Sequence, residues 1–100
     1  ATVKESYVQP REIVVSGSKA LEVAEALTST TMKIMQLLSK ESLDVSTIGE
    51  RLDLSEAYIS EQVQLLEEIG LIKVTYQRGK RGIRKVSEAA VSKITIIIHE

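Results

Sequence analysis

The chain has 100 residues, of which 43% are hydrophobic and 27% charged, a composition typical of one globular domain rather than of a disordered or fibrous chain. It has no cysteine, which excludes thiolate chemistry, and no apolar run approaches the roughly 20 residues of a membrane-spanning helix. The formal net charge of −1 neither favours nor excludes a nucleic-acid partner. Because the first dozen residues are polar and charged rather than signal-like, we expect a cytoplasmic protein with no membrane partner.

The apolar residues are almost entirely aliphatic. The sequence has no Phe and no Trp, so the core must be built from Ile, Leu and Val, and Tyr7, Tyr58 and Tyr76 are the only aromatic side chains. Aliphatic, cysteine-free and highly charged compositions are found in proteins from thermophiles, and we expect such an origin.

The first segment predicts a lead-in followed by a short strand. Residues 1–11 contain the only proline, and we expect them to form a flexible lead-in to a single domain over residues 12–100. The β-branched run Ile13–Val15 predicts a strand, and the Ser-Gly-Ser sequence at residues 16–18 predicts the turn that closes it.

Two helices are predicted next. Ser18 is a suitable N-cap for a helix that begins at Lys19, and the cluster Thr28–Thr31 offers new N-caps for a second helix that ends near Ser39. Apolar residues at helical spacing predict the buried faces as Leu21, Ala24 and Leu27 in the first helix and Ile34, Leu37 and Leu38 in the second.

A short helix and a longer one follow, joined by a tight connection. The short helix covers residues 45–52 and contains Gly49, which costs about 1 kcal/mol of helix propensity relative to Ala. We therefore expect a close helix crossing that leaves no space for a side chain there. Ser55 is predicted to cap the longer helix, which covers residues 56–69 and ends at Gly70. The predicted buried residues are Val45, Ile48 and Leu52 in the short helix and Ile59, Val63, Leu66 and Ile69 in the long one.

After Gly70 the apolar period changes from about 3.6 residues to about 2. The alternation of Ile72, Val74 and Tyr76 with polar residues predicts a half-buried strand. A glycine-flanked hairpin tip at residues 78–82 and a returning strand over residues 83–87 follow.

The last segment, residues 93–99, contains four Ile residues, and such dense β-branching favours a strand. A helix with Ala90, Ile94 and Ile97 on one face is the alternative. As a strand, it is expected to pair with Ile13–Val15 or across a subunit boundary, because an unpaired Ile-rich edge promotes aggregation.

Charge is segregated along the chain. Residues 41–69 carry eight acidic residues and one basic residue, a local charge of −7, whereas residues 70–87 carry six basic residues and no acidic one. Such segregation indicates that one surface is reserved for a polyanion.

Two helices with a short connection, followed at once by a hairpin with a basic tip, form a winged helix-turn-helix. The predicted fold is α+β, mostly α, with about four helices, a two-stranded wing and short terminal strands. In such a domain the second helix of the motif enters the major groove and the wing lies on the DNA backbone or in the minor groove. The candidate DNA-binding residues of the wing are Arg78, Lys80, Arg81, Arg84 and Lys85.

The recognition helix, residues 55–69, has no Lys or Arg on its outward face. Its candidate DNA-binding residues are Ser55, Ala57, Tyr58, Ser60, Glu61 and Gln64. Glu accepts a hydrogen bond from cytosine, Gln bonds adenine and Ala contacts the thymine methyl group, so an acidic helix still has the means to read bases. Affinity is then expected to come mainly from the wing.

The stretch from Val45 to Ile72, VSTIGERLDLSEAYISEQVQLLEEIGLI, resembles the helix-turn-helix of ArsR-like winged-helix regulators, especially their archaeal members. The family pattern is matched by Leu52, Ser55, Ser60 and the run LEEIGL at residues 66–71, and the resemblance covers residues 27–99. It implies a homodimeric, sequence-specific regulator of transcription that binds double-stranded DNA, with the helix Lys19–Leu27 as a dimer element. A homodimer also supplies the affinity that one small module lacks.

Metal-sensing members of that family use Cys ligands, which are absent here, and His99 is the only histidine. We therefore expect neither a metal site nor a cofactor, and no residues indicate an effector. Without a nucleophile–base pair we also expect no enzyme activity. The alternative function is a protein-interaction adaptor that uses the acidic face of residues 41–69.

Overall fold

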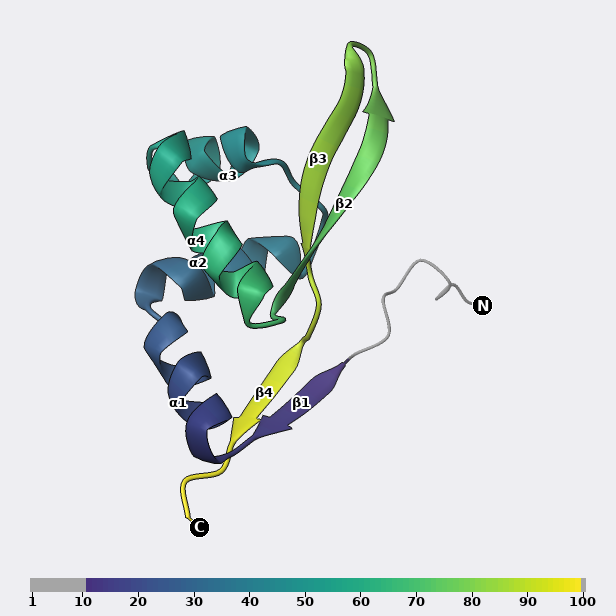
Figure 1. The fold of residues 1–100 in the computed structure, drawn as a ribbon. Helices are drawn as coiled ribbons and strands as arrows, with labels where there is room; N and C mark the ends of the chain where they lie inside the picture. Colours follow the sequence, from purple (N-terminus) through teal and green to yellow (C-terminus); the bar gives the residue numbers. More distant parts are fainter. Residues whose placement is uncertain (1–10, 100) are drawn as a thin grey trace, which may run out of the picture.

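The computed structural model describes residues 11–99 (Figure 1). The elements are β1 (Glu12–Val15), α1 (Gly17–Ala26), α2 (Ser29–Leu38), α3 (Val45–Leu52), α4 (Glu56–Glu68), β2 (Ile72–Gly79), β3 (Gly82–Ala89) and β4 (Lys93–Ile96). The predicted α+β fold class, with its four helices, two-stranded wing and terminal strands, is confirmed. The predicted lead-in lies outside the described residues except for Arg11. Across residues 11–99, no helix combines the length and apolar character that crossing a membrane requires.

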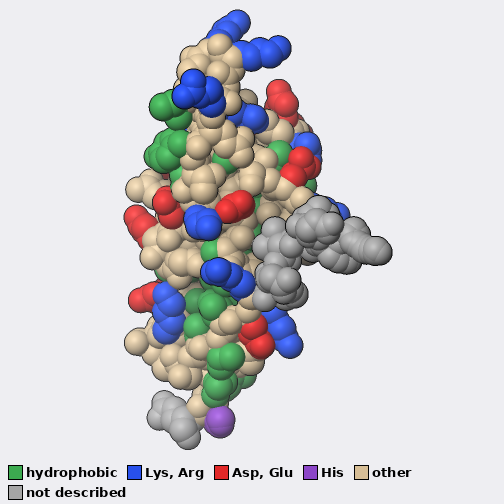
Figure 2. Space-filling model, turned by 90° about the vertical axis from the view of Figure 1, so that its right-hand side faces the viewer, with side chains coloured by type: hydrophobic (Ala, Val, Ile, Leu, Met, Phe, Trp, Pro, Cys, Tyr) green, Lys and Arg blue, Asp and Glu red, His purple; other side chains and the backbone are tan. Residues whose placement is uncertain are grey.

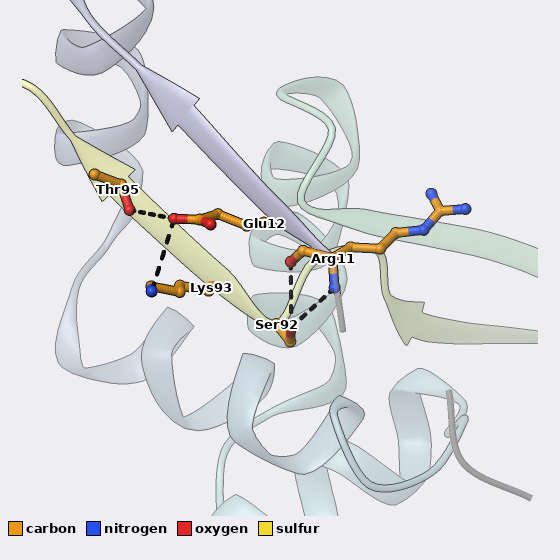
Figure 3. Close-up of polar contacts among 5 residues, drawn as sticks. All are labelled: Arg11, Glu12, Ser92, Lys93 and Thr95. Carbon is orange, nitrogen blue, oxygen red and sulfur yellow. Dashed lines mark hydrogen bonds and ion pairs between the residues drawn. The ribbon is translucent and has the colours of Figure 1, made fainter. Parts of the chain in front are cut away.

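The first and last strands form a small parallel sheet at the end of the molecule opposite the wing (Figure 1). The register runs from Glu12 beside Lys93 to Val15 beside Ile96, so the pairing of the two segments is confirmed. The predicted strand over residues 93–99 is confirmed for residues 93–96, and residues 97–99 lie beyond its end. Figure 3 shows the side-chain contacts that reinforce it. The Glu12 carboxylate accepts a hydrogen bond from the Thr95 hydroxyl at 2.7 Å and lies 3.8 Å from the Lys93 ammonium group.

Helix α1 differs from its prediction in both its start and its buried face. It begins at Gly17, whose φ of +59° lies in the left-handed region, and not at Lys19 after a cap by Ser18. Its buried residues are Ala20, Val23 and Ala26, whereas the predicted Leu21 is 69% exposed, Ala24 is exposed and Leu27 is half-buried. Ala20 and Val23 pack with Val15 of β1, and Ala26 belongs to the main core, so packing on both sides sets the rotation of the helix about its axis.

The main core is aliphatic, as predicted, and lies between α2, α3, α4 and the base of the wing. A capping box formed by Thr28 and Thr31 starts α2, which confirms the predicted helix boundary. Thr31 is fully buried, and its hydroxyl group is satisfied there because it also donates a hydrogen bond to the Ala26 carbonyl. The buried face of α2 includes Met35, and the predicted Leu37 is only half-buried.

The wing is longer than predicted, because its strands extend to a turn of only two residues, Lys80 and Arg81. At its base, Leu43 and Ser87 exchange two backbone hydrogen bonds of 3.0 and 2.8 Å, which attach the loop before α3 to β3. The predicted half-burial of the alternating residues holds for Ile72 and Val74 but is wrong for Tyr76, which is 67% exposed. Beyond Val74 the hairpin projects past the helices, so no core remains to cover the side chain (Figure 1).

Candidate nucleic-acid interface

The connection between α3 and α4 is a tight turn built on backbone hydrogen bonds. Asp53 ends α3 in the left-handed conformation with φ of 58°, and the Leu54 amide donates to the Gly49 carbonyl at 2.9 Å. A Cβ atom on Gly49 would lie 2.8 Å from the Leu54 carbonyl oxygen, so the prediction that no side chain fits there is confirmed. The close neighbour is the backbone of the turn rather than a crossing helix.

Ser55 starts α4 as predicted. Its hydroxyl oxygen accepts a hydrogen bond from the Tyr58 amide at 3.1 Å, which satisfies one of the unpaired donors of the first helical turn. Helix α4 begins at the end of the molecule from which the wing projects and runs away from it (Figure 1). The N-terminal half of α4 and the wing therefore lie on the same end of the domain.

The structure places the predicted recognition residues on the open side of α4. Ile59, Val63 and Leu66 are buried, as predicted, and Ile69 is half-buried. The six candidates Ser55, Ala57, Tyr58, Ser60, Glu61 and Gln64 are all exposed. The open side carries acidic and neutral groups only, so its electrostatic potential opposes the approach of a phosphate backbone.

The basic residues of the wing are exposed and fall into two groups. Among residues 11–99, Arg78, Lys80, Arg81 and Lys85 form no ion pair. Arg84 differs from them, because its Nε and one terminal nitrogen each lie 3.0 Å from Oδ2 of Asp44. Figure 2 shows Lys and Arg side chains gathered at the tip of the wing.

Asp44 lies beside the candidate interface and makes a contact that its local sequence does not predict. Its Oδ1 accepts a hydrogen bond from the Thr47 amide at 2.8 Å and so caps α3, while its other oxygen binds Arg84. Hydrogen bonds from the Thr47 side chain and backbone, together with the charge of Arg84, lower the pKa of Asp44 against the opposing effect of burial. Its position before an apolar helix signals a cap, but no local pattern signals the partner on the wing.

A second set of contacts fixes the base of the wing. The Ser42 hydroxyl lies 3.1 Å from one oxygen of Glu88, and the Lys73 ammonium group lies 3.7 Å from the other. Together with the Asp44–Arg84 contact, these bonds hold the hairpin against the loop before α3. In the part of the chain that the structure describes, no three His, Cys, Asp or Glu side chains are grouped so as to hold a metal ion.

These helices, the tight turn and the basic hairpin define a winged helix-turn-helix domain. Residues 28–74 match the family model described as "Bacterial regulatory protein, arsR family". With the structural likenesses below, this confirms the resemblance to ArsR-like winged helix-turn-helix regulators that was inferred from the sequence.

Several solved structures are similar. ZitR from Lactococcus lactis is 28% identical with a TM-score of 0.55, over 63% of this chain and 42% of its own. An ArsR-like transcriptional regulator from Rhodococcus sp. RHA1 is 25% identical with a TM-score of 0.57, over 72% of this chain and 65% of its own. HlyU from Vibrio cholerae shares the fold at 21% identity and a TM-score of 0.58, over 75% of this chain and 78% of its own. No curated protein sequence matches the chain.

Proposed function

We propose that the chain is a homodimeric transcriptional regulator that binds specific sequences of double-stranded DNA. The observation that carries the proposal is the wing tip, where Arg78, Lys80, Arg81 and Lys85 project into solvent without an ion-pair partner among residues 11–99. Unpaired cations on a narrow projecting hairpin are suited to meeting phosphates, whose counterions they displace. Arg84 is assigned a second role, since its contact with Asp44 sets the direction of the wing.

In this proposal α4 reads bases from the major groove through the first half of the helix. Ala57, Glu61 and Gln64 are exposed on one side and have side chains that contact thymine, cytosine and adenine respectively. The acidic pair Glu67 and Glu68 lies at the far end of the helix, away from the duplex. The helix supplies selectivity and the wing supplies most of the affinity.

The dimer is assigned to the end of the molecule opposite the wing. There Leu21 on α1 is 69% exposed, Val14 on β1 57% and Ile96 on β4 38%, and a second copy would cover exposed apolar side chains at this end. Two copies related by a two-fold axis would present two recognition helices to a palindromic site.

The test compares two double variants that remove the same charge. The first variant, Lys80→Ala with Arg81→Ala, removes two cations of the wing. The second, Lys33→Ala with Lys40→Ala, removes one exposed cation of α2 and one of the segment that follows it. Binding to a mixed-sequence duplex is measured by fluorescence anisotropy over a series of salt concentrations. We expect the wing variant to lower the slope of log affinity against log salt by about 2 per subunit, and the control to leave it unchanged. Equal slopes in both variants would contradict the proposal.

The same measurement separates the alternative function, a protein-interaction adaptor. The acidic segment 41–69 is exposed along α4, although Glu41 and Asp44 are paired with Arg51 and Arg84. An adaptor that docks through this face would not bind duplex DNA in a salt-dependent way. Retention of the wild-type chain on immobilised duplex, with elution by salt, therefore favours the regulator.

A further inference from the structure

The projecting part of the wing carries two large apolar side chains that do not pack in the core. Ile83 is 79% exposed and Tyr76 is 67% exposed. The strand register places Ile83 beside Arg78 and Tyr76 beside Lys85. Because directly paired residues of an antiparallel hairpin project from the same face, these four side chains form one surface, here called the Tyr76–Ile83 patch.

Both faces of the hairpin pack on the domain at its base. Ile72, Val74 and Ala89, on the face of the patch, belong to the core, and Val86 on the opposite face is 1% exposed. The Tyr76–Ile83 patch lies on the part of the hairpin that extends beyond this core, and Figure 2 shows exposed hydrophobic side chains next to the basic ones on the wing.

The surroundings of the patch favour one kind of partner. Ile83 lies two residues after Arg81 of the basic turn, and residues 70–87 contain six basic residues and no acidic one. Duplex DNA combines an anionic outside with a stacked apolar interior, which matches an apolar side chain flanked by cations. Side chains that project from the tip of the hairpin, rather than the ribbon as a whole, are narrow enough to enter a minor groove about 6 Å wide.

We propose that Ile83 is an apolar wedge, which enters between neighbouring base pairs from the minor groove, unstacks one step and bends the duplex. This inference rests on the proposed function, since it assumes that the wing lies in the minor groove. Apolar side chains of other minor-groove proteins kink DNA in this way. Flexible TA steps unstack most readily, and the amino group of guanine occupies the floor of the groove, so the wing is expected to prefer A·T-rich DNA.

The test uses an alternating A·T duplex of about 24 base pairs, in which every second step is TA. One copy of the duplex carries 2-aminopurine, whose fluorescence rises on unstacking, and another carries a donor and an acceptor dye at its two ends. Two matched variants are compared with the wild-type chain: Ile83→Thr keeps the β-branched shape but is polar, and Ile83→Leu keeps the apolar character. Because Ile83 is exposed, neither variant removes a core contact.

We expect the wild-type chain and Ile83→Leu to raise the 2-aminopurine signal and to bring the dyes closer together. Ile83→Thr should lose both effects while retaining its salt slope, with an affinity within about tenfold of the wild type. An alternating G·C duplex should show weaker binding and no bending.

Three outcomes would overturn the proposal. The first is salt-dependent binding without any rise in 2-aminopurine fluorescence, or with the same rise for Ile83→Thr. This result would contradict the role of Ile83 as a wedge but not the proposed function. Absence of duplex binding by the wild-type chain would remove both. Binding of the patch to vesicles of anionic lipid, with no binding to the duplex, would assign the surface to a membrane instead.

Discussion

The side chains of Asp44 and Arg84 are 40 residues apart in the sequence and meet in a two-point contact of 3.0 Å at each nitrogen. Asp44 simultaneously caps α3 through the Thr47 amide. One carboxylate thus joins the first helix of the motif to the wing. This group therefore helps to fix the angle between α3 and the wing, and under the proposed function simultaneous contact with two grooves depends on that angle.

Replacement of Asp44 should separate its two roles. Asp44→Asn keeps an oxygen that can cap α3 but removes the charge, whereas Asp44→Ala removes both. We expect the free energy of unfolding to fall by about 1–2 kcal/mol for Ala. The loss for Asn should stay below about 1 kcal/mol, because the side chain of Arg84 is 48% exposed and solvent screens the pair. Urea unfolding measures both, with Glu25→Gln at an exposed position of α1 as a control, and equal losses for Asn and Ala would contradict the division of roles.

The lowered pKa of Asp44 predicts a dependence of stability on pH. A carboxyl group whose pKa is lower in the folded state than in the unfolded state stabilises the fold at pH values above its unfolded pKa. For Asp44 the ordinary value is 3.8, so its contribution should be complete at neutral pH and should be lost as the pH falls below 3.8 through the lower folded value. Unfolding of the wild type and of Asp44→Asn, followed from pH 7 downward, should converge in that acidic range. A constant difference down to the lowest pH would show that the charge of Asp44 is not involved.

Substitution of Gly49 should destabilise the domain even though Ala is the better helix former. The added Cβ would lie 2.8 Å from the Leu54 carbonyl oxygen, a backbone atom that cannot move without shifting the turn. We expect Gly49→Ala to cost about 1–3 kcal/mol, measured by thermal unfolding. The control is Ser46→Ala on the exposed side of the same helix, which should change stability by less than about 0.5 kcal/mol. Stabilisation by Gly49→Ala would mean that the turn relaxes freely.

The apolar end formed by α1 and the terminal sheet should control the oligomeric state. Leu21→Glu places a charge at a position that is 69% exposed in one chain and is expected to be covered in the dimer. Sedimentation at micromolar concentration should show a dimer for the wild type and a monomer for Leu21→Glu. Leu65→Glu, on α4 at a position 39% exposed, is the control and should remain dimeric. A wild-type chain that sediments as a monomer would contradict the proposed homodimer.

Local patterns in the sequence were sufficient to predict most elements and the surface that carries the candidate residues. Ser55, Gly70 and the change of period after it mark the ends of α4 and the start of the wing, because caps and periodicity depend on neighbouring residues. The predicted buried face of α1 was wrong, because Leu21 fits a helical pattern as well as Val23 does. Only packing on the terminal sheet decides which of the two is buried. The predicted burial of Tyr76 was wrong for a related reason. Alternation predicts which side chains share a face of the strand, but not how far the core extends beneath that face. The contacts of Arg84 and Glu88 with the loop before α3 depend on tertiary structure alone.

The parallel pairing of β1 with β4 also has a kinetic consequence. The hydrogen bonds between Arg11 and Ser92 at its start close a loop of 81 residues, whereas the backbone hydrogen bonds within α4 and within the wing hairpin join near neighbours in the chain. Long loops are closed late and at a larger entropic cost, so the terminal sheet should assemble after the motif and open before it. Its amide protons should therefore exchange with solvent well before those of α4. In the proposed dimer, a second chain bound at this end would slow that opening and so protect the part of the fold that opens first.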